Sequence, residues 1–373
     1  MKRVLVTGAS DFLGLNLRQA LKRRADSFAV VPFDRTEPVG ELTRLLAGAD
    51  AVCHLDAVYR SNDPSEFETV NVGLTRGIIA RLEAAGNRPA IVYASSTRSG
   101  DPTPYGQSRL AAEKLLEGYA QRTLASLTVL RLPNEFGKWC RPDHASVVAT
   151  FCHRVAHGQE PEVHDSGHML SLAYIDDIVG AVVRALETPL PGTHLASVEP
   201  TFSITVGELA GKIRGFASTR QNLIVPNFAD DLTRRLYATY LSYLDGPQFS
   251  YALSKRSDAR GELAEYFKSS CFGQVFVSRT RPGITRGNHY HDTKTEKFCI
   301  LDGEALIRFR HMVTGERVKH RVKGEEFRVV DIPPGWTHSI ENVGATDLIV
   351  LFWASEIFDP EHPDTFCSEV LND

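Results

Sequence analysis

Two histidines and a glutamate lie close together in the C-terminal third of this 373-residue chain. His289 and His291 flank a single residue, and Glu296 follows His291 after five positions. Alternate residues of a β-strand point to the same side, so both imidazoles are expected to reach one ion. A tight turn after the strand would bring Glu296 to the same point.

A fourth ligand of the right kind, His338, follows a turn-like Pro-Pro-Gly segment at residues 333–335. Three imidazoles and one carboxylate suit zinc, and also iron, manganese or nickel. The alternative is a chance grouping of exposed strand histidines with a surface glutamate. The spacing favours a metal site, with zinc as the first expectation, and its predicted ligands are His289, His291, Glu296 and His338.

The N-terminus carries a different pattern, in which an apolar run at residues 3–6 leads into a glycine turn. Such a turn places backbone N–H groups and a helix N-terminus against a dinucleotide pyrophosphate. Gly8 permits the sharp turn, and Gly14 lets the helix and strand pack closely. The predicted cofactor-binding residues of this turn are Gly8, Ser10, Asp11, Phe12, Leu13 and Gly14.

An acidic residue, Asp34, stands 20 residues after Gly14 at the end of the second expected strand. An acid at this point normally meets the ribose hydroxyls of NAD(H). Arg35 follows directly and would instead hold the 2′-phosphate of NADP(H). Both residues are predicted to bind the cofactor, and the residues alone leave the choice between the two cofactors open.

A second group of reactive residues follows the fourth expected strand. Tyr105 and Arg109 are four residues apart and so lie on one face of a helix. There the cation would lower the phenol pKa and let Tyr105 act as a general acid or base. Ser96 would orient the same carbonyl group. A Tyr and an Arg at this spacing are also common on surfaces, but their place after the strand favours catalysis.

The elements that position the N-terminal residues alternate between strand and helix up to residue 131. Strands are expected at 3–6, 28–33, 51–55, 90–94 and 127–131, and helices at 12–24, 64–85 and 107–119. Repeated strand–helix units predict an α/β fold with a Rossmann-like, doubly wound parallel sheet. Residues 132–245 are less regular and are interpreted as a lid or substrate region.

From about Phe249 the pattern changes to short strands separated by glycine and proline, which begin around Gly273. Such a pattern predicts an all-β barrel or jelly roll. The boundary is expected at residues 245–247. The sequence therefore predicts two domains, residues 1–245 and residues 246–373.

Composition excludes several other classes of protein. A net charge of −4 without a basic run does not favour nucleic-acid binding. The longest apolar stretches, such as 348–354, are too short to span a bilayer. Six scattered cysteines without a Cys-x-x-Cys pair, and an N-terminus unlike a signal peptide, predict a cytoplasmic protein without a membrane partner.

Residues 1–245 resemble the extended short-chain dehydrogenase/reductase family. The segments that carry the resemblance are Thr7-Gly8-Ala9, Phe12-Leu13-Gly14, His54-Leu55, Asn71-Val72, Ser95-Ser96, Tyr105-Gly106, Arg131, Asn134, Gly137 and residues 174–178. The chain departs from the family at three positions, because the middle glycine is Asp11, the catalytic lysine is Arg109, and Asp56 replaces a small residue. Asp11 would repel a pyrophosphate charge about 4 Å away by roughly 4 kcal/mol at an effective dielectric of about 20. The planar guanidinium of Arg109 does not copy a compact ammonium group.

Residues 255–365 resemble the cupin family. Its two motifs look like His289-x-His291-x4-Glu296-x6-Gly303 and Pro333-x-Gly335-x2-His338-x3-Asn342, and only the spacing from Gly324 to Pro333 departs. The resemblance implies the same four metal ligands and a cupin barrel. It also implies a homodimer formed through the barrels.

The whole chain is similar to the CapF-type bifunctional enzymes of capsular polysaccharide biosynthesis. The segments that look shared are 136–140, 240–243, 258–261, 286–289, 294–297 and 358–360. The resemblance implies zinc-dependent C3 epimerisation of a UDP-4-keto-6-deoxy-hexosamine, followed by NADPH-dependent reduction at C4. Lys294, His320 and Tyr290 are candidates for the base that epimerisation needs.

Two alternatives stay open. In the first, the cupin is a metal-dependent isomerase, lyase or oxygenase of a natural-product pathway, beside a degenerate N-terminal domain that does not reduce. In the second, the chain is a non-catalytic module in which the metal and the fold support assembly.

Overall fold

The structure, a computed structural model, describes residues 1–371. The chain divides into two compact units. The first contains Met1–Arg214 and Arg235–Leu244, and the second contains Gly215–Arg234 and the chain from Asp245 onward. Residues 372 and 373 of the expected domain 246–373 lie outside the described residues.

A six-stranded parallel sheet forms the centre of the first unit, with the strand order β2-β1-β3-β4-β5-β8. The strands are β1 (Lys2–Thr7), β2 (Phe28–Phe33), β3 (Ala51–His54), β4 (Ala90–Ser96), β5 (Leu127–Leu132) and β8 (Thr193–Ala196). The order reverses direction between β1 and β3, so the carboxyl ends of these strands border the crevice where doubly wound sheets bind ligands. The predicted α/β fold is confirmed.

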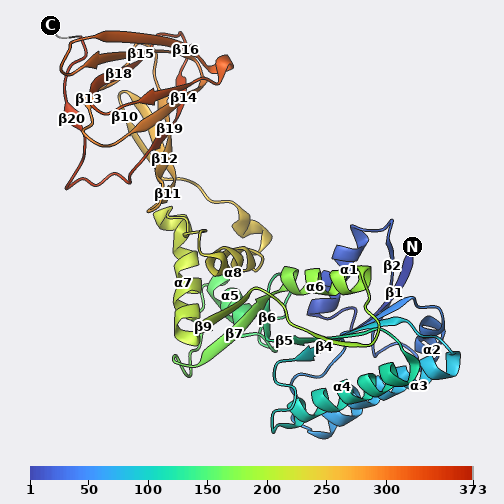
Figure 1. The fold of residues 1–373 in the computed structure, drawn as a ribbon. Helices are drawn as coiled ribbons and strands as arrows, with labels where there is room; N and C mark the ends of the chain where they lie inside the picture. The colour runs from blue at the N-terminus through green and yellow to red at the C-terminus, as the bar shows by residue number, and fades with distance from the viewer. Residues whose placement is uncertain (372–373) are drawn as a thin grey trace. The chain divides into compact units, whose positions relative to one another are not determined.

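Helices cover both faces of this sheet (Figure 1). One face packs against α1 (Phe12–Lys22) and α6 (Ile175–Glu187), and the other against α2 (Val39–Ala47), α3 (Gly73–Ala85) and α4 (Pro104–Thr123). The inner strands β1, β3, β4 and β5 are therefore largely buried on both sides, which explains their nearly continuous apolar sequences.

The remainder of the first unit differs in part from the expectation. The helix expected at 64–85 begins as a π-helix (Phe67–Val72) before it continues as α3. β8 lies in the region interpreted as a lid, but it extends the central sheet by pairing in parallel with β5. This four-residue strand was not predicted, because it has no apolar run. Residues 132–245, the region interpreted as a lid, also contain β6 (Asn134–Phe136), β7 (Met169–Tyr174), β9 (Thr201–Thr205), α5 (Val147–Ala156), α7 (Val206–Asn222) and α8 (Asp231–Leu241).

Two antiparallel sheets form the second unit, and the predicted all-β fold is confirmed. In sheet order, the first has β10 (Lys255–Asp258), β11 (Gly261–Ser269), β12 (Gly273–Thr280), β19 (Leu348–Ala354), β14 (Glu296–Asp302) and β17 (Val329–Ile332). The second has β16 (Arg317–Lys323), β15 (Glu304–His311), β18 (Trp336–Asn342), β13 (Thr285–Tyr290) and β20 (Phe366–Cys367). Short 3-10 helices occur at Gly246–Phe249 and Gly324–Glu326.

The β-structure of the second unit begins earlier than expected, because β10 and β11 precede Gly273. All four residues of β10 are exposed, so this strand lacks the apolar alternation that reveals a half-buried strand. The core between the two sheets is formed by apolar side chains from both, including Phe298, Ile307, Phe309, Ile340 and Phe352.

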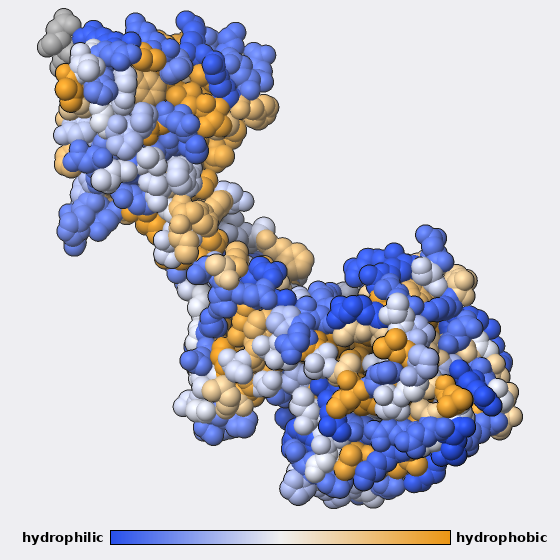
Figure 2. Space-filling view, viewed as in Figure 1, coloured by the Kyte–Doolittle hydropathy of each residue, from blue (hydrophilic) through white to orange (hydrophobic). Residues whose placement is uncertain are grey.

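The surface is mixed in character. Figure 2 shows hydrophilic residues over much of the visible surface of each unit, with hydrophobic residues in smaller groups. Among residues 1–371, no helix combines the length and the apolar character needed to cross a membrane.

Candidate functional site

The four predicted metal ligands come from both sheets of the second unit. His289 of β13 pairs with His338 of β18 in one sheet, and Glu296 begins β14 in the other. His291 was expected on the same strand as His289, but it lies one residue beyond the end of β13. The strand is irregular here because Asn288 has a positive φ of 61° and the register shifts beside it.

These side chains nevertheless converge. One ligand atom from each of the four residues lies within 4.8 Å of the others. Glu296 Oε2 is 3.4 Å from His291 Nε2 and 3.7 Å from His338 Nε2. Tetrahedral donors bound to zinc at about 2.0–2.2 Å lie roughly 3.4 Å apart, so this spacing fits a metal ion.

The buried nitrogen atoms of the cluster also fit a metal. Within the described chain, Nε2 of His291 and Nε2 of His338 are buried without a hydrogen-bond partner. Burial lowers the pKa of His338 to about 3 and that of His289 to about 4. Burial alone would raise the pKa of Glu296, but its contact with His291 and nearby positive charge lower it. At neutral pH His289 and His338 thus offer neutral imidazoles and Glu296 offers a carboxylate, which are the protonation states that bind metal.

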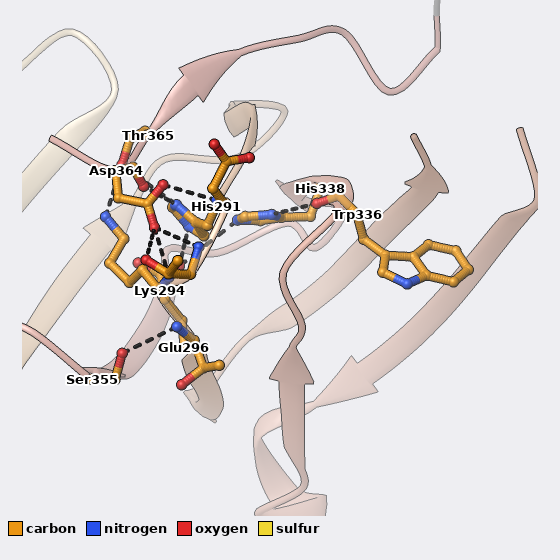
Figure 3. A network of polar contacts seen from close by, with 11 residues as sticks. His291, Lys294, Glu296, Trp336, His338, Ser355, Asp364 and Thr365 are labelled. Carbon is orange, nitrogen blue, oxygen red and sulfur yellow. Dashed lines mark hydrogen bonds and ion pairs between the residues drawn. The ribbon is translucent and has the colours of Figure 1, made fainter. Parts of the chain in front are cut away.

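The chain returns to this cluster near its C-terminal end, where Asp364 supports the ligands (Figure 3). Nδ1 of His291 donates to the main-chain oxygen of Asp364 at 2.6 Å, which leaves Nε2 to face the cluster. The Asp364 carboxylate accepts from the backbone N–H groups of Asp292, Thr293 and Lys294 at 2.6–2.8 Å. The sequence analysis missed Asp364, because no motif links it to residues 292–294.

The three candidates for the base occupy different surroundings. Lys294 is 5% exposed, and its Nζ donates to Thr365 Oγ1 at 2.8 Å. Tyr290 stacks its ring on an aromatic ring of β20 at 5.2 Å. His320 lies on the half-buried face of β16, with its ring 5.8 Å from that of Phe309. Phe309 is in turn 6.4 Å from the ring of His338, a predicted ligand.

The predicted cofactor residues of the first unit gather at the carboxyl ends of β1 and β2. Gly8 follows β1 with a φ of 66°, and a Cβ on Gly14 would lie 2.1 Å from the Gly8 oxygen. Only glycine at position 14 therefore lets α1 start this close to the turn. Asp11 is the N-cap of α1, and within the described residues its side chain makes no capping hydrogen bond. Phe12 and Leu13 form the first turn of the helix.

Both polar residues after β2 already have partners in this crevice. Asp34 accepts from Ser10 N at 3.0 Å and from Ser10 Oγ at 2.5 Å. Arg35 Nε lies 2.9 Å from Oδ1 of Asp56, so the cation expected at a 2′-phosphate is paired within the chain. Asp56 follows β3 and is only 2% exposed. Burial raises its pKa to about 6, although Arg35 acts in the opposite direction.

The predicted catalytic residues lie around the end of β4 and the start of α4. Tyr105 is half-buried, and Ser96 Oγ accepts from the backbone N–H of Arg98 at 3.1 Å. Arg109 is 2% exposed; its guanidinium donates to the main-chain oxygen of Ala94 and lies 4.7 Å from the Tyr93 ring centre. Its Nε and Nη1 are buried and find no hydrogen-bond partner among residues 1–371.

One acidic residue of this crevice was not predicted. Glu135 of β6 lies close enough to Arg109 for their charges to interact. Burial raises the pKa of Glu135 to about 7, and Arg109 counteracts part of this effect. Its only signal in the sequence was its place between Asn134 and Gly137, two residues of the dehydrogenase resemblance.

Two family profiles together cover most of the chain. The NAD dependent epimerase/dehydratase family matches residues 4–196, and the polysaccharide biosynthesis C-terminal domain matches residues 256–366. The crystal structure of capsular polysaccharide assembling protein CapF from Staphylococcus aureus is similar with a TM-score of 0.91. The two are 39% identical, over 98% of this chain and 100% of that chain. The chain belongs to the CapF-type family.

Two further relatives match all or part of the chain. UDP-2-acetamido-2,6-beta-L-arabino-hexul-4-ose reductase from Pseudomonas aeruginosa is 39% identical, over 99% of each chain. UDP-glucose 4-epimerase from Thermus thermophilus, solved with NAD, is 23% identical with a TM-score of 0.51, over 58% of this chain and 83% of that chain. The second likeness shows only that the N-terminal fold is shared.

Proposed function

We propose that this chain is a nucleotide-sugar enzyme whose C-terminal metal centre epimerises C3 of a UDP-4-keto-6-deoxy-hexosamine. The observation that carries the proposal is the convergence of His289, His291, Glu296 and His338, whose ligand atoms lie within 4.8 Å of one another. The substrate class follows from the full-length Pseudomonas relative, which is named for a UDP-linked hexul-4-ose.

Epimerisation at C3 needs only proton transfer. The C4 ketone acidifies the adjacent C3–H bond, and a divalent metal held by the four ligands would polarise the oxygen and favour the anion. A base removes the C3 proton from one face of the sugar, and an acid returns a proton to the other. No electrons are gained or lost overall, so this half of the chemistry requires no nucleotide cofactor.

Among the three candidates, His320 has the environment best suited to proton transfer. It is half-buried, its side of β16 faces the barrel interior, and the aromatic ring of Phe309 separates it from His338. An imidazole side chain can accept a proton in its neutral form and donate one as imidazolium. Lys294 is instead held by Thr365 beside the ligand loop, so we assign it to positioning that loop.

NADPH-dependent reduction at C4 is a second candidate function. It is favoured by the reductase name of the Pseudomonas relative and by the close approach of Gly14 to Gly8. The charged residues of the crevice do not fit NADP(H), because Arg35 is paired with Asp56 and Asp11 stands at the start of α1. We therefore derive no reaction step through this cofactor.

Solvent exchange tests the proposed epimerisation. Protein loaded with zinc should incorporate deuterium from D2O at C3 of a UDP-4-keto-6-deoxy-hexosamine, detected by NMR and mass spectrometry. The His291→Ala variant should lose the metal and the exchange together. The proposal fails if fully metal-loaded protein shows no exchange under conditions where Staphylococcus aureus CapF does.

A further inference from the structure

We propose that the dinucleotide crevice of the first unit is closed to NADP(H) by its own side chains, chiefly by the Arg35–Asp56 pair with Asp11 beside it. The inference goes beyond the proposed epimerisation, because it concerns a different part of the chain and a different ligand. The chain keeps the parallel sheet and its glycine turn, but the crevice lacks the free positive charge that a phosphorylated dinucleotide needs.

The Arg35–Asp56 pair removes the cation that would select a 2′-phosphate. Arg35 Nε is 2.9 Å from Asp56 Oδ1, and Asp56 is almost entirely excluded from solvent. A phosphate that took Arg35 away would leave a buried carboxylate without its counter-ion. Leaving the buried carboxylate of Asp56 without its partner is unfavourable, whereas an arginine that has no such partner would bind the phosphate without this loss.

The backbone keeps Asp56 within this crevice. A Cβ built on Gly8 would lie 2.9 Å from the Asp56 Cα, so the end of β3 is in contact with the glycine turn. The backbone N–H groups of Leu55 and Asp56 both face Thr7 Oγ1, at 3.2 and 3.4 Å. The backbone position that carries the Asp56 carboxylate is therefore fixed beside the turn that would bind the pyrophosphate.

Two further acidic groups border the same turn. Asp11 occupies the N-cap position of α1, at the helix end that would otherwise attract an anion, and its negative charge offsets this attraction. Asp34 is bonded to Ser10 through both its oxygens, so ribose hydroxyls would have to compete with an existing partner. The net charge of Asp11, Asp34, Arg35 and Asp56 is −2, which repels the pyrophosphate as well as the 2′-phosphate.

The nicotinamide end of the crevice also departs from the dehydrogenase family pattern, at Arg109. Arg109 directs its guanidinium toward the Ala94 oxygen and the Tyr93 ring. A buried guanidinium held in this way does not copy the compact ammonium group of the lysine that the dehydrogenase resemblance places four residues after Tyr105. The changes at the two ends are independent, and both disfavour the bound cofactor.

Titration of the full-length, metal-loaded protein with NADPH, followed by its fluorescence and by calorimetry, tests the inference. The doubly substituted Asp11→Gly/Asp56→Ala chain should bind NADPH at least about 100-fold more tightly than the wild type. Asp26→Ala, which removes an exposed carboxylate outside the crevice, should bind no better than the wild type. If the first variant does not fold, an Asp11→Asn/Asp56→Asn chain, whose side chains have the same size as those of the wild type, replaces it in the same titration.

Two results would overturn the inference. One is micromolar binding of NADPH by the wild type. The other is a folded variant, judged by circular dichroism and Tm, that binds NADPH no more tightly than the wild type. Because binding is measured without a sugar substrate, either result is independent of C3 exchange and leaves the proposed epimerisation to its own test.

Discussion

Nδ1 of His291 lies 2.6 Å from the main-chain oxygen of Asp364, although 73 positions separate the two residues. The Asp364 side chain holds this oxygen in place, because its carboxylate binds three consecutive backbone N–H groups of the ligand loop. Asp364→Ala should therefore lower metal affinity about 10–100-fold without removing a ligand. Zinc competition against a chromophoric chelator measures this change.

Asp359→Ala is the matched control for Asp364→Ala, since Asp359 is exposed in the same C-terminal segment and bonds only locally in the described structure. It should leave zinc affinity unchanged. Cobalt-substituted Asp364→Ala should also show altered visible absorption, which a general loss of stability would not produce. Equal zinc affinities in both variants would show that Asp364 does not orient the ligands.

The metal ligands themselves give a sharper prediction. His338→Ala and His291→Ala should each abolish stoichiometric metal, because either change removes one of four donors from a buried site. Loss of bound metal should also lower Tm, since a ligand that binds only the folded state stabilises it. Elemental analysis and differential scanning calorimetry measure both effects.

His362→Ala provides the control for the ligand variants. His362 is exposed, with an 83% accessible side chain, and lies outside the ligand cluster. It should retain the full metal content and the Tm of the wild type. A His291→Ala or His338→Ala protein that still held one metal per chain would refute the ligand set.

The sequence predicted that these four side chains converge, because most of the information for this cluster is local. His289, His291 and Glu296 occur within eight residues, and His338 follows a recognisable turn. Asp364 could not be predicted in this way, since its role depends on the chain returning to β13 through β20. The irregularity of β13 at Asn288, before His291, was equally hidden, because it is seen only as a positive φ and a register shift in the folded chain.

The first unit shows the same contrast between features that nearby residues determine and features that depend on residues far apart in the sequence. Gly8 and Gly14 were predicted from a turn of a few residues, and the structure places them in close contact. The Arg35–Asp56 pair arises because β2 and β3 flank β1 in the parallel sheet, which brings together residues that follow two different strands. Sequence identified both residues as unusual or functional, but only the strand order shows that they neutralise each other.

Proton transfer by His320 predicts a selective loss of activity. His320→Asn should slow deuterium exchange at C3 by about 100-fold or more, because the amide cannot act as a general base. Metal content should stay at the wild-type level, since His320 lies outside the ligand cluster. The neighbouring Lys319 is exposed on the other side of β16, and Lys319→Ala should exchange normally. Normal exchange in His320→Asn would exclude this histidine as the base.

The burial of Asp56 predicts a pH-dependent stability difference in the metal-free protein. Its pKa is raised to about 6 in the folded chain, from an ordinary value of 3.8, by burial and by Asp11 and Asp34, against the opposing charges of Arg35 and Arg109. Folding therefore favours the protonated form, so this contribution to stability is present below about pH 4 and is lost as the pH rises through 6.

Asp56→Ala should remove this dependence. The free energy of unfolding of the variant, relative to that of the wild type, should therefore be higher at pH 7.5 than at pH 4.5, by up to about 3 kcal/mol. Urea unfolding of both proteins at the two pH values, followed by circular dichroism, measures the difference. Arg35 loses little when its partner is removed, because its side chain is 41% exposed and can be solvated. A stability difference that is equal at both pH values would mean that Asp56 is ionised without cost in the folded chain, and that its pairing with Arg35 is strong enough to offset its burial.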